Sequence, residues 1–415
     1  MSTVREQAER ARRASRALAS LGRGTKDRAL GTVAARLRAS VPRIGEANAR
    51  DLERGRSAGL SDAMLDRLGM GPKVVESTAA GVEHVVALPD PVGSRGPMRR
   101  LDSGLLVGRQ RLPLGVIAMI YESRPNVTVD AAALCIKSGN AVLLRGGKDA
   151  AETNQVLGAV IGEALEEAGL PRDAVQIVPA TDREGIRELL GLSDLVDLAI
   201  PRGGEGLIRF VAENARVPVI KHYKGVCHLY LDEGCDAAMA TSLALNGKTQ
   251  RPGVCNALEC MLVHQVDAAR VLPGVCEALI AEGVEIRGCP RTCALVPGAH
   301  AASDDDWGSE FLAKILAVRV VDDLDAALEH VARYGSNHTE VICTGSYPRA
   351  ERWLAEVDAS CVMVNASSRF NDGAQLGLGA EIGISTSKLH AYGPMGLESL
   401  TAEKWIVLGE GQIRS

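Results

Sequence analysis

The chain has 415 residues, of which 46% are hydrophobic and 24% charged, a composition typical of a folded protein with two or three domains. The net charge is −5 and aromatic residues make up only 3%, which argues against nucleic-acid binding through charge or base stacking. No apolar run approaches the roughly 18 residues of a membrane span, and the charged N-terminus does not resemble a signal peptide, so we expect a cytoplasmic enzyme with free thiols.

The first 60 residues are predicted to be helical. Alanine and arginine dominate residues 4–21, a second amphipathic stretch covers 26–40, and Gly22 and Gly24 between them act as stop signals. From residue 87 to 113, prolines and glycines exclude a helix. Residues 98–112 within that stretch predict a β-hairpin with its turn near Asp102-Ser103-Gly104.

A regular alternation of strands and helices follows the hairpin. The expected strands are 115–121, 141–145, 175–179, 195–200 and 217–221. The expected helices between them are 129–138, 150–168, 183–190 and 205–215. This pattern is typical of a parallel sheet of Rossmann type.

A second α/β stretch occupies roughly residues 226 to 365. Its expected helices are 237–246, 265–282 and 324–334, and its expected strands are 259–264, 316–321 and 339–344. The last 50 residues are rich in glycine and end in a predicted strand, 401–408.

Two glycine-containing loops are candidate cofactor-binding sites. Gly203 and Gly204 lie between a predicted strand and a predicted helix, where backbone amides can hold a phosphate. A glycine turn without a ligand explains this pattern equally well. Arg145 and Lys148 flank two glycines at the end of another strand, and two cations there favour a 2′-phosphate and hence NADP over NAD. Solvated surface charge is the alternative.

One cysteine stands apart from the others. Cys255 follows Pro252-Gly253, and we expect it at the start of a helix, where the helix N-terminus together with Lys248 and Arg251 would lower its thiol pKa. Exposed backbone amides there could also stabilise an oxyanion. The pair Cys289 and Cys293 lacks a matching second pair, so no zinc site is predicted. Five other cysteines sit in helix or strand patterns and are expected to be small buried hydrophobes: Cys135, Cys227, Cys276, Cys343 and Cys361.

These segments together resemble the glutamate-5-semialdehyde dehydrogenase family, also called γ-glutamyl phosphate reductases, within the aldehyde dehydrogenase superfamily. The resemblance runs from end to end, and its most specific part is the string Lys-Thr-Gln-Arg-Pro-Gly-Val-Cys-Asn at 248–256. Six further segments carry it: 113–126, 138–148, 221–228, 334–340, 364–370 and 377–396.

The resemblance implies an α/β, aldehyde dehydrogenase-like fold in three parts. The parts are a Rossmann-type NADP-binding domain (1–97 and 113–225), an α/β catalytic domain (226–365), and a small β oligomerisation flap with the C-terminal segment (98–112 and 366–415). A homodimer or homotetramer is implied through the flap.

The implied reaction is the NADPH-dependent reduction of L-glutamyl 5-phosphate to L-glutamate 5-semialdehyde and phosphate in proline biosynthesis, with Cys255 forming a thioester. Hydrolytic relatives carry a glutamate base in the stretch that matches 219–225, whereas this stretch is basic and has no carboxylate. Ser123, with Asn126 close by, matches the position of their oxyanion-binding asparagine, and Glu310 partly matches their ribose-binding glutamate.

The substrate must be bound through its carboxylate and its phosphate. Guanidinium groups bind such anions in a bidentate way, so Arg251 and Arg369 are the preferred candidates, with His222 and Ser367 as further donors.

Three other functions stay open at this point. The chain could be a hydrolytic or a CoA-acylating aldehyde dehydrogenase, or a non-catalytic member built on the same scaffold. If it is the reductase, the glutamate 5-kinase that supplies the unstable acyl phosphate is another polypeptide, and we expect at least transient contact with it.

Overall fold

The computed structural model of the chain describes residues 3–179 and 183–414. It divides into two compact units. The first unit contains Met1–Lys221, Leu378–Gly383 and Met395–Ser415, and the second contains His222–Gly377 and Ile384–Pro394.

The first unit is built on a four-stranded parallel sheet in the order β5-β4-β3-β6. Every residue of β3 is buried, as expected for a strand that helices cover on both faces. The alternation predicted from the sequence is therefore confirmed. The four strands are β3 (Val116–Tyr121), β4 (Ala141–Arg145), β5 (Val175–Ile177) and β6 (Leu198–Arg202).

The strand predicted at 217–221 is wrong. This stretch forms only one isolated bridge, between Val219 and Ala199 of β6. Pro218 has no N–H to donate and so interrupts the ladder at the edge of the sheet.

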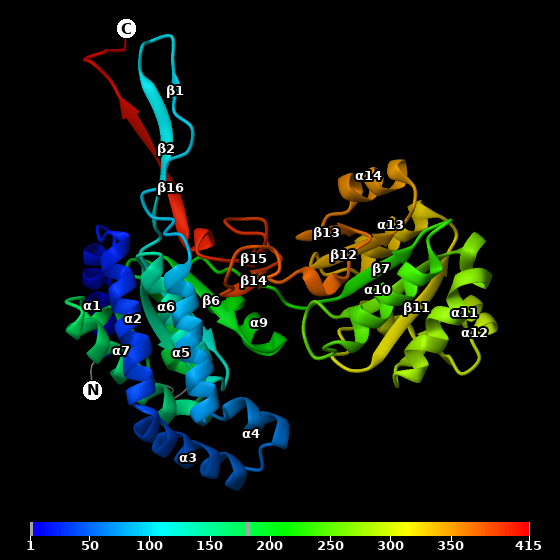
Figure 1. The fold of residues 1–415 in the computed structure, drawn as a ribbon, viewed down its shortest axis with the longest axis horizontal. Coiled ribbons are helices and arrows are strands. Elements are labelled where there is room, and N and C mark those ends of the chain that lie inside the picture. Colours follow the sequence, from blue (N-terminus) through cyan, green and yellow to red (C-terminus); the bar gives the residue numbers. More distant parts are fainter. Residues whose placement is uncertain (1–2, 180–182, 415) are drawn as a thin grey trace. The chain divides into compact units, whose positions relative to one another are not determined.

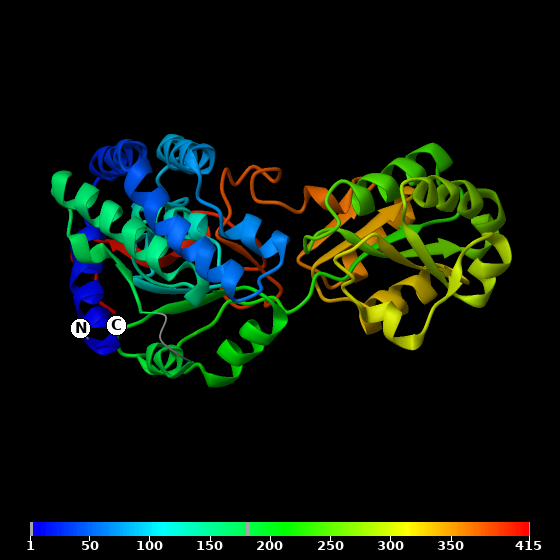
Figure 2. The same ribbon diagram turned by 90° about the horizontal axis from the view of Figure 1, so that it is seen from below.

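Helices cover both faces of this sheet. Figure 2 shows α2, α5 and α7 on one side and α8 and α9 on the other. The helix α1 begins at a capping box in which Thr3 and Glu6 satisfy each other's backbone amides. The helices are α1 (Val4–Leu18), α2 (Arg23–Ala39), α3 (Val41–Ser57), α4 (Asp62–Leu68), α5 (Pro72–Ala87), α6 (Pro125–Lys137), α7 (Ala151–Glu167), α8 (Arg183–Gly191) and α9 (Glu205–Asn214).

A three-stranded antiparallel sheet extends from the first unit (Figure 1). It joins β1 (Arg99–Arg100) and β2 (Leu106–Pro113) of the predicted hairpin with β16 (Thr401–Leu408). Both the hairpin and the C-terminal strand predicted from the sequence are therefore confirmed.

The second unit contains a seven-stranded parallel sheet in the order β10-β9-β11-β8-β7-β12-β13. Alternate strand residues point to two apolar layers, because successive side chains face opposite sides of a sheet. One layer packs on α10 and α11, and the other packs on α13 and α14, where Trp353 stacks on Tyr230.

The elements of this unit include five helices and seven strands. The helices are α10 (Ala237–Thr249), α11 (Gln265–Ala281), α12 (Pro290–Leu295), α13 (Leu324–Tyr334) and α14 (Tyr347–Glu356). The strands are β7 (Cys227–Leu231), β8 (Leu258–His264), β9 (Glu285–Gly288), β10 (His300–Ala301), β11 (Ile315–Val321), β12 (Thr339–Cys343) and β13 (Cys361–Val364). The sequence pattern missed β7, β9, β10, β13, α12 and α14.

The chain passes between the units at β14 (Gly383–Ser385) and β15 (Gly393–Met395), which pair with each other. The first division between the units falls after Lys221, four residues before the boundary expected at 225. The hairpin is grouped with the first unit, and the functional labels of the domains stay predictions. Among the described helices, none has the length and apolar character needed to cross a membrane.

Candidate active site

Cys255 lies in the turn that joins the end of α10 to the start of β8. Its thiol forms no disulfide and is half-buried. The prediction of a helix start is wrong, because α10 ends at Thr249 and the backbone turns again where the Ala257 N–H donates to the Val254 carbonyl at 3.0 Å. No helix macrodipole is therefore available at this position to lower the thiol pKa.

Gly225 packs directly against the backbone of Cys255. A Cβ atom added to Gly225 would lie 2.0 Å from the Cys255 carbonyl oxygen, so only glycine fits. The Gly225 N–H donates to the Glu310 Oε1 atom at 3.0 Å. The structure thus brings Glu310 next to the cysteine loop, where its carboxylate binds this backbone amide, and its predicted role at a cofactor ribose stays a prediction.

The segment 367–371 is hydrogen-bonded to the other side of the cysteine loop. The Ser368 hydroxyl donates to the Asn256 carbonyl at 2.8 Å, and Asn256 Nδ2 donates to the Asn371 carbonyl at 2.9 Å. Ser367, a predicted substrate donor, is buried, and its Oγ accepts the Arg369 N–H at 3.3 Å. This segment therefore fixes the position from which Arg369 reaches the loop.

Arg369 and Arg251 form a cationic neighbourhood beside Cys255. The Arg369 Nε donates to Gln250 Oε1 at 2.7 Å, which holds the half-buried guanidinium over the loop. Burial and then the positive charge of Arg251 lower the pKa of Arg369, whereas Asp372 and the Cys255 thiol raise it. Two guanidiniums held this close together favour an anion between them.

His222, the remaining predicted substrate donor, begins the second unit. Its Nδ1 lies 3.1 Å from the Ile384 carbonyl oxygen, and its ring centroid lies 6.0 Å from that of His338. The contacts of its ring therefore include a backbone group and a second imidazole.

Sequence reasoning missed His338, which lies behind the cysteine loop. Cys227 links the two, since its thiol donates to the Cys255 carbonyl at 3.2 Å and its sulfur lies 3.7 Å from His338 Nδ1. Burial lowers the pKa of His338 to about 3, so this imidazole is neutral at physiological pH. Cys227 is buried as expected, and it also ties β7 to the loop.

Lys248, which was expected to lower the thiol pKa of Cys255, has a carboxylate partner. It is buried in an ion pair with Glu259, with 2.5 Å between Nζ and Oε2. Burial lowers the pKa of Lys248 and raises the pKa of Glu259 to about 7. Sequence reasoning missed this pair; Lys248 lies on the buried side of α10 with Ala240, Ala244 and Gly247, and a buried cation needs a partner.

The predicted oxyanion donors lie in the first unit and have other acceptors. The Ser123 hydroxyl donates to Asp149 Oδ2 at 2.8 Å, and Asn126 Nδ2 donates to Asp130 Oδ2 at 3.2 Å. Burial raises the pKa of Asp130 to about 6. Both side chains are therefore already used as donors, and their catalytic role stays a prediction.

Gly203 and Gly204 lie at the end of β6 and the start of α9, as expected. The Gly204 N–H already donates to Glu122 Oε1 at 2.8 Å, and a Cβ atom on Gly203 would lie 2.6 Å from the Glu122 carboxyl carbon. A phosphate bound to this amide must therefore displace Glu122. Sequence reasoning missed this carboxylate.

A cavity of about 280 Å³ adjoins the Gly204 loop. Arg183 lies at its edge with its guanidinium 5.4 Å from the centre of the Phe210 ring. The other lining residues are Glu122, Ile186, Gly204, Gly206 and Leu207. At the end of β4, the half-buried Arg145 donates to the Gly146 carbonyl at 3.1 Å, while Lys148 is exposed.

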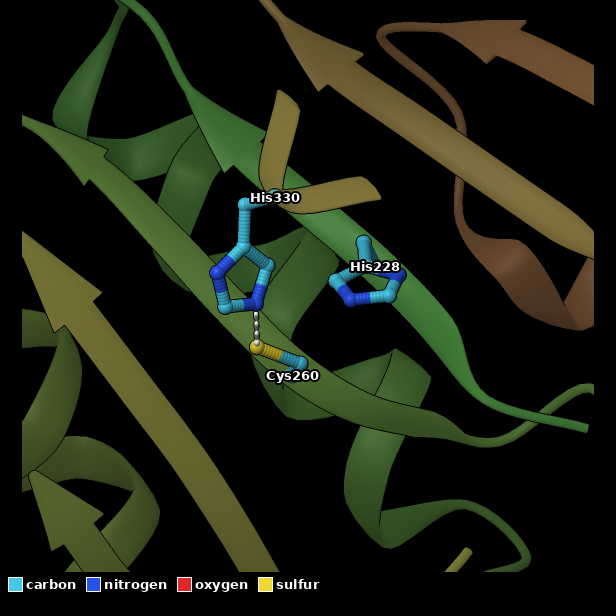
Figure 3. A group of neighbouring side chains, drawn as sticks. All are labelled: His228, Cys260 and His330. Carbon is cyan, nitrogen blue, oxygen red and sulfur yellow. Dashed lines mark hydrogen bonds between the residues drawn. The ribbon is translucent and has the colours of Figure 1, made fainter. Parts of the chain in front are cut away.

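Among the residues that the structure describes, three buried side chains of the second unit lie close enough to share a metal ion: His228, Cys260 and His330 (Figure 3). The Arg319 guanidinium lies 3.1 Å from His330 Nδ1, and because a guanidinium only donates, the proton of His330 is on Nε2 and faces the Cys260 sulfur at 3.6 Å. Burial lowers the pKa of His228, but the Glu340 carboxylate raises it more, to about 10. His330 therefore has both ring nitrogens engaged, by Arg319 and by Cys260, and offers no free lone pair to a cation, so the group is described as a buried core cluster.

Comparison with known proteins bears on the whole chain. The aldehyde dehydrogenase family model matches residues 2–284. A γ-glutamyl phosphate reductase of Sorangium cellulosum is 63% identical over 99% of this chain and 97% of its own length, and one of Desulfatibacillum aliphaticivorans is 57% identical over 99% of each. The crystal structure of a γ-glutamyl phosphate reductase from Thermotoga maritima superposes with a TM-score of 0.98 at 43% identity, covering 100% of both chains.

Proposed function

The chain belongs to the γ-glutamyl phosphate reductases, aldehyde dehydrogenase-family oxidoreductases of proline biosynthesis, and we propose that it reduces L-glutamyl 5-phosphate with NADPH through a thioester on Cys255. The observation that carries this proposal is the half-buried thiol with the guanidiniums of Arg251 and Arg369 beside it. A nucleophile next to two cations suits a substrate whose leaving group is phosphate.

The first half of the reaction transfers the acyl group to the enzyme. The Cys255 thiolate attacks the acyl carbon, the C–O bond to phosphate breaks, and phosphate leaves with the electron pair while the guanidiniums of Arg251 and Arg369 stabilise its charge. The stretch 219–225 contributes no carboxylate that could activate water, which protects the thioester from hydrolysis. Glu310 is bound to the Gly225 amide and so helps to hold the loop.

The second half releases the aldehyde. Reduced NADP, when bound, supplies a hydride. The thioester carbon becomes a thiohemiacetal, which collapses as the carbonyl re-forms and the Cys255 thiolate leaves. The same cations that bind the phosphate favour the return of the sulfur to its thiolate form.

The first unit fits a dinucleotide. The cavity of about 280 Å³ beside Gly204 combines an apolar wall at Ile186 and Phe210 with the cation Arg183, and Glu122 would have to leave the Gly204 amide for a phosphate to bind there. Gly204, Arg145 and Lys148 would hold the phosphates. This fit supports NADP, and comparing kcat/KM for NADP and NAD in one assay tests the preference.

We further propose a homodimer or homotetramer that uses the three-stranded sheet. The edge strand β16 exposes Trp405 and Val407 on one face and Leu408 on the other, apolar side chains that a partner subunit can cover. Sedimentation of a monomer at micromolar concentration would contradict this. A transient complex with glutamate 5-kinase and a cytoplasmic location, where Cys255 stays reduced, belong to the same proposal.

The reverse reaction tests the proposed function. The protein is incubated with L-glutamate 5-semialdehyde and NADP, with and without inorganic phosphate, and the absorbance of NADPH is followed. Sustained reduction only with phosphate is the expected result. Sustained reduction without phosphate indicates a hydrolytic dehydrogenase, dependence on CoA indicates an acylating one, and no reduction by folded protein indicates a non-catalytic member.

A further inference from the structure

The loop that carries Cys255 is closed at its base by the buried pair of Lys248 and Glu259. Lys248 lies in the last turn of α10 and Glu259 is the second residue of β8, so the two residues flank the loop on either side. Both side chains are 0% exposed, and 2.5 Å separates Nζ from Oε2. The pair therefore fixes the distance between the two ends of the catalytic loop.

Glu259 also connects the loop base to the segment 310–312. Its Oε1 accepts the Leu312 N–H at 3.2 Å, and Leu312 has a φ of 53°, a left-handed conformation that a leucine holds only when its surroundings fix it. The Phe311 ring lies 5.9 Å from Lys248 Nζ. One carboxylate thus serves the helix, the strand and this segment.

Segment 310–312 is in turn connected to Cys255 through Gly225. Glu310 accepts the Gly225 N–H, and Gly225 has room for no side chain because the Cys255 backbone lies against it. If Glu259 moved, the position of Cys255 would therefore change through two sets of contacts. One is the Lys248–Glu259 pair at the loop ends, and the other is the contact of Gly225 with the Cys255 backbone.

Stability alone does not explain a buried pair of charges. Removing two ions from water costs free energy, and replacing such a pair by apolar residues is often neutral or stabilising. What the pair supplies here is a defined geometry at the base of a loop that has no helical or sheet structure of its own.

We infer that Lys248 and Glu259 are positioning residues for Cys255, holding its sulfur where it can attack the acyl carbon. The effect that we expect on turnover when the pair is lost rests on the proposed function. The effect that we expect on the reactivity of the Cys255 thiol does not depend on any substrate.

The test removes the pair and keeps the charge balance, with the double variant Lys248→Met/Glu259→Leu. A matched control exists in the first unit, where Lys26 and Asp90 form another buried pair with 2.5 Å between Nζ and Oδ2. The control variant is Lys26→Met/Asp90→Leu. Each protein is assayed for kcat and KM in the reverse reaction and for the rate at which iodoacetamide alkylates Cys255, read by peptide mass.

We expect the double variant at 248 and 259 to fold, with kcat reduced about tenfold or more and KM for phosphate within about twofold of the original. Because the loop is less restrained, alkylation of Cys255 is expected to be about threefold faster or more. The control variant is expected to keep both the original kcat and the original alkylation rate. A folded double variant with unchanged kcat and unchanged alkylation rate overturns the inference.

A single variant decides the question if the double variant does not fold. Glu259→Gln keeps an acceptor for the Leu312 N–H but points an amide donor at Lys248, so only the link to α10 is lost. We expect about a threefold loss of kcat and faster alkylation, and unchanged values contradict the inference. If the original protein shows no phosphate-dependent turnover, the proposed function has failed, and the alkylation rates still decide the positioning role.

Discussion

The Gly204 loop of the first unit and the Cys255 loop of the second were both expected at the start of a helix, and only the first is there. Gly204 follows a strand and precedes α9, which is the local pattern that the sequence shows. Cys255 follows α10 and precedes β8, and side chains distant in sequence, such as Ser368 and Glu310, hold its surroundings. Local sequence patterns therefore predict the placement of the Gly204 loop, whereas the Cys255 loop depends on tertiary contacts.

The difference also changes the explanation of the thiol's reactivity. A helix N-terminus would have lowered the thiol pKa through its backbone dipoles. Without that helix, we expect the positive charge of Arg369, which interacts with the Cys255 thiol, and that of the neighbouring Arg251 to favour the thiolate. The reactivity of Cys255 and its affinity for phosphate are then expected to come from the same two side chains.

The largest expected effect comes from removing the nucleophile of the cysteine loop. Cys255→Ala is expected to lower kcat by about a thousandfold or more, because no covalent intermediate can form. Folding is expected to be unaffected, since this turn is half-buried and outside the core. Steady-state assays and thermal unfolding measure both effects. Cys289→Ala, at another half-buried thiol of the same unit, is the control, and retention of a few per cent of activity by the Cys255 variant contradicts the covalent mechanism.

The base of the same loop is expected to make stability depend on pH. Burial raises the pKa of Glu259 to about 7, above the ordinary value of 4.5, so between these values the folded state holds a proton that the unfolded state releases. Stability is therefore expected to fall as pH rises from about 4.5 to 7, by about tenfold in the folding equilibrium constant for each unit of pKa difference.

Glu259→Gln cannot titrate and is expected to flatten this pH dependence. Thermal unfolding at several pH values measures it, with the exposed Glu277→Gln as control. A wild-type stability that rises from pH 4.5 to 7, with no difference between the two variants, contradicts the assignment to Glu259.

A third expected effect distinguishes the two arginines from ordinary surface cations. Arg369→Met is expected to raise KM for phosphate in the reverse reaction about tenfold or more, because a charge-assisted contact to the anion is lost. Arg352→Met, on α14 and paired there with Glu356, is expected to leave KM unchanged. Equal effects of the two substitutions would show that general surface charge binds the phosphate.

The smallest expected effect tests the Gly204 loop. Glu122→Gln keeps an oxygen for the Gly204 N–H and removes the negative charge that a cofactor phosphate would meet. Binding of NADP is expected to become about threefold tighter at low salt, as measured by titration calorimetry. Glu188→Gln, on the exposed side of α8, is the control, and unchanged binding by the Glu122 variant would place the phosphates away from Gly204.

The elements that the sequence predicted are those with a clear period. β4, α13 and β16 have the apolar pattern of a buried strand, an amphipathic helix and an exposed antiparallel strand, and each was placed to within a residue. The strand β7 was missed because Cys227 and His228 interrupt its apolar run, and both are buried only through tertiary partners. The local pattern of residues along one sequence does not show which distant side chains become their partners.

The candidate site divides in the same way. Residue type and local sequence singled out Cys255 as a candidate nucleophile and Arg251 and Arg369 as candidate anion ligands, and their roles stay predictions. The roles of two buried residues nearby were not predicted, although Glu259 follows the string 248–256 by three residues and His338 lies within the segment 334–340. Their contacts with Lys248 and Cys227 became visible only when the chain was folded. A polar residue is buried when it has a hydrogen-bond or ion-pair partner, and the sequence alone does not show which residue that partner is.

The most direct test is to look for the acyl group on Cys255. The protein is mixed with L-glutamate 5-semialdehyde and NADP without phosphate and quenched in acid within the first turnover, before the substrate's own amino group can attack the thioester. Peptide mass spectrometry is expected to find a glutamyl group on Cys255 and one NADPH formed per modified cysteine. Formation of NADPH with an unmodified Cys255, or with the acyl group on another residue, would contradict the covalent mechanism proposed for this chain.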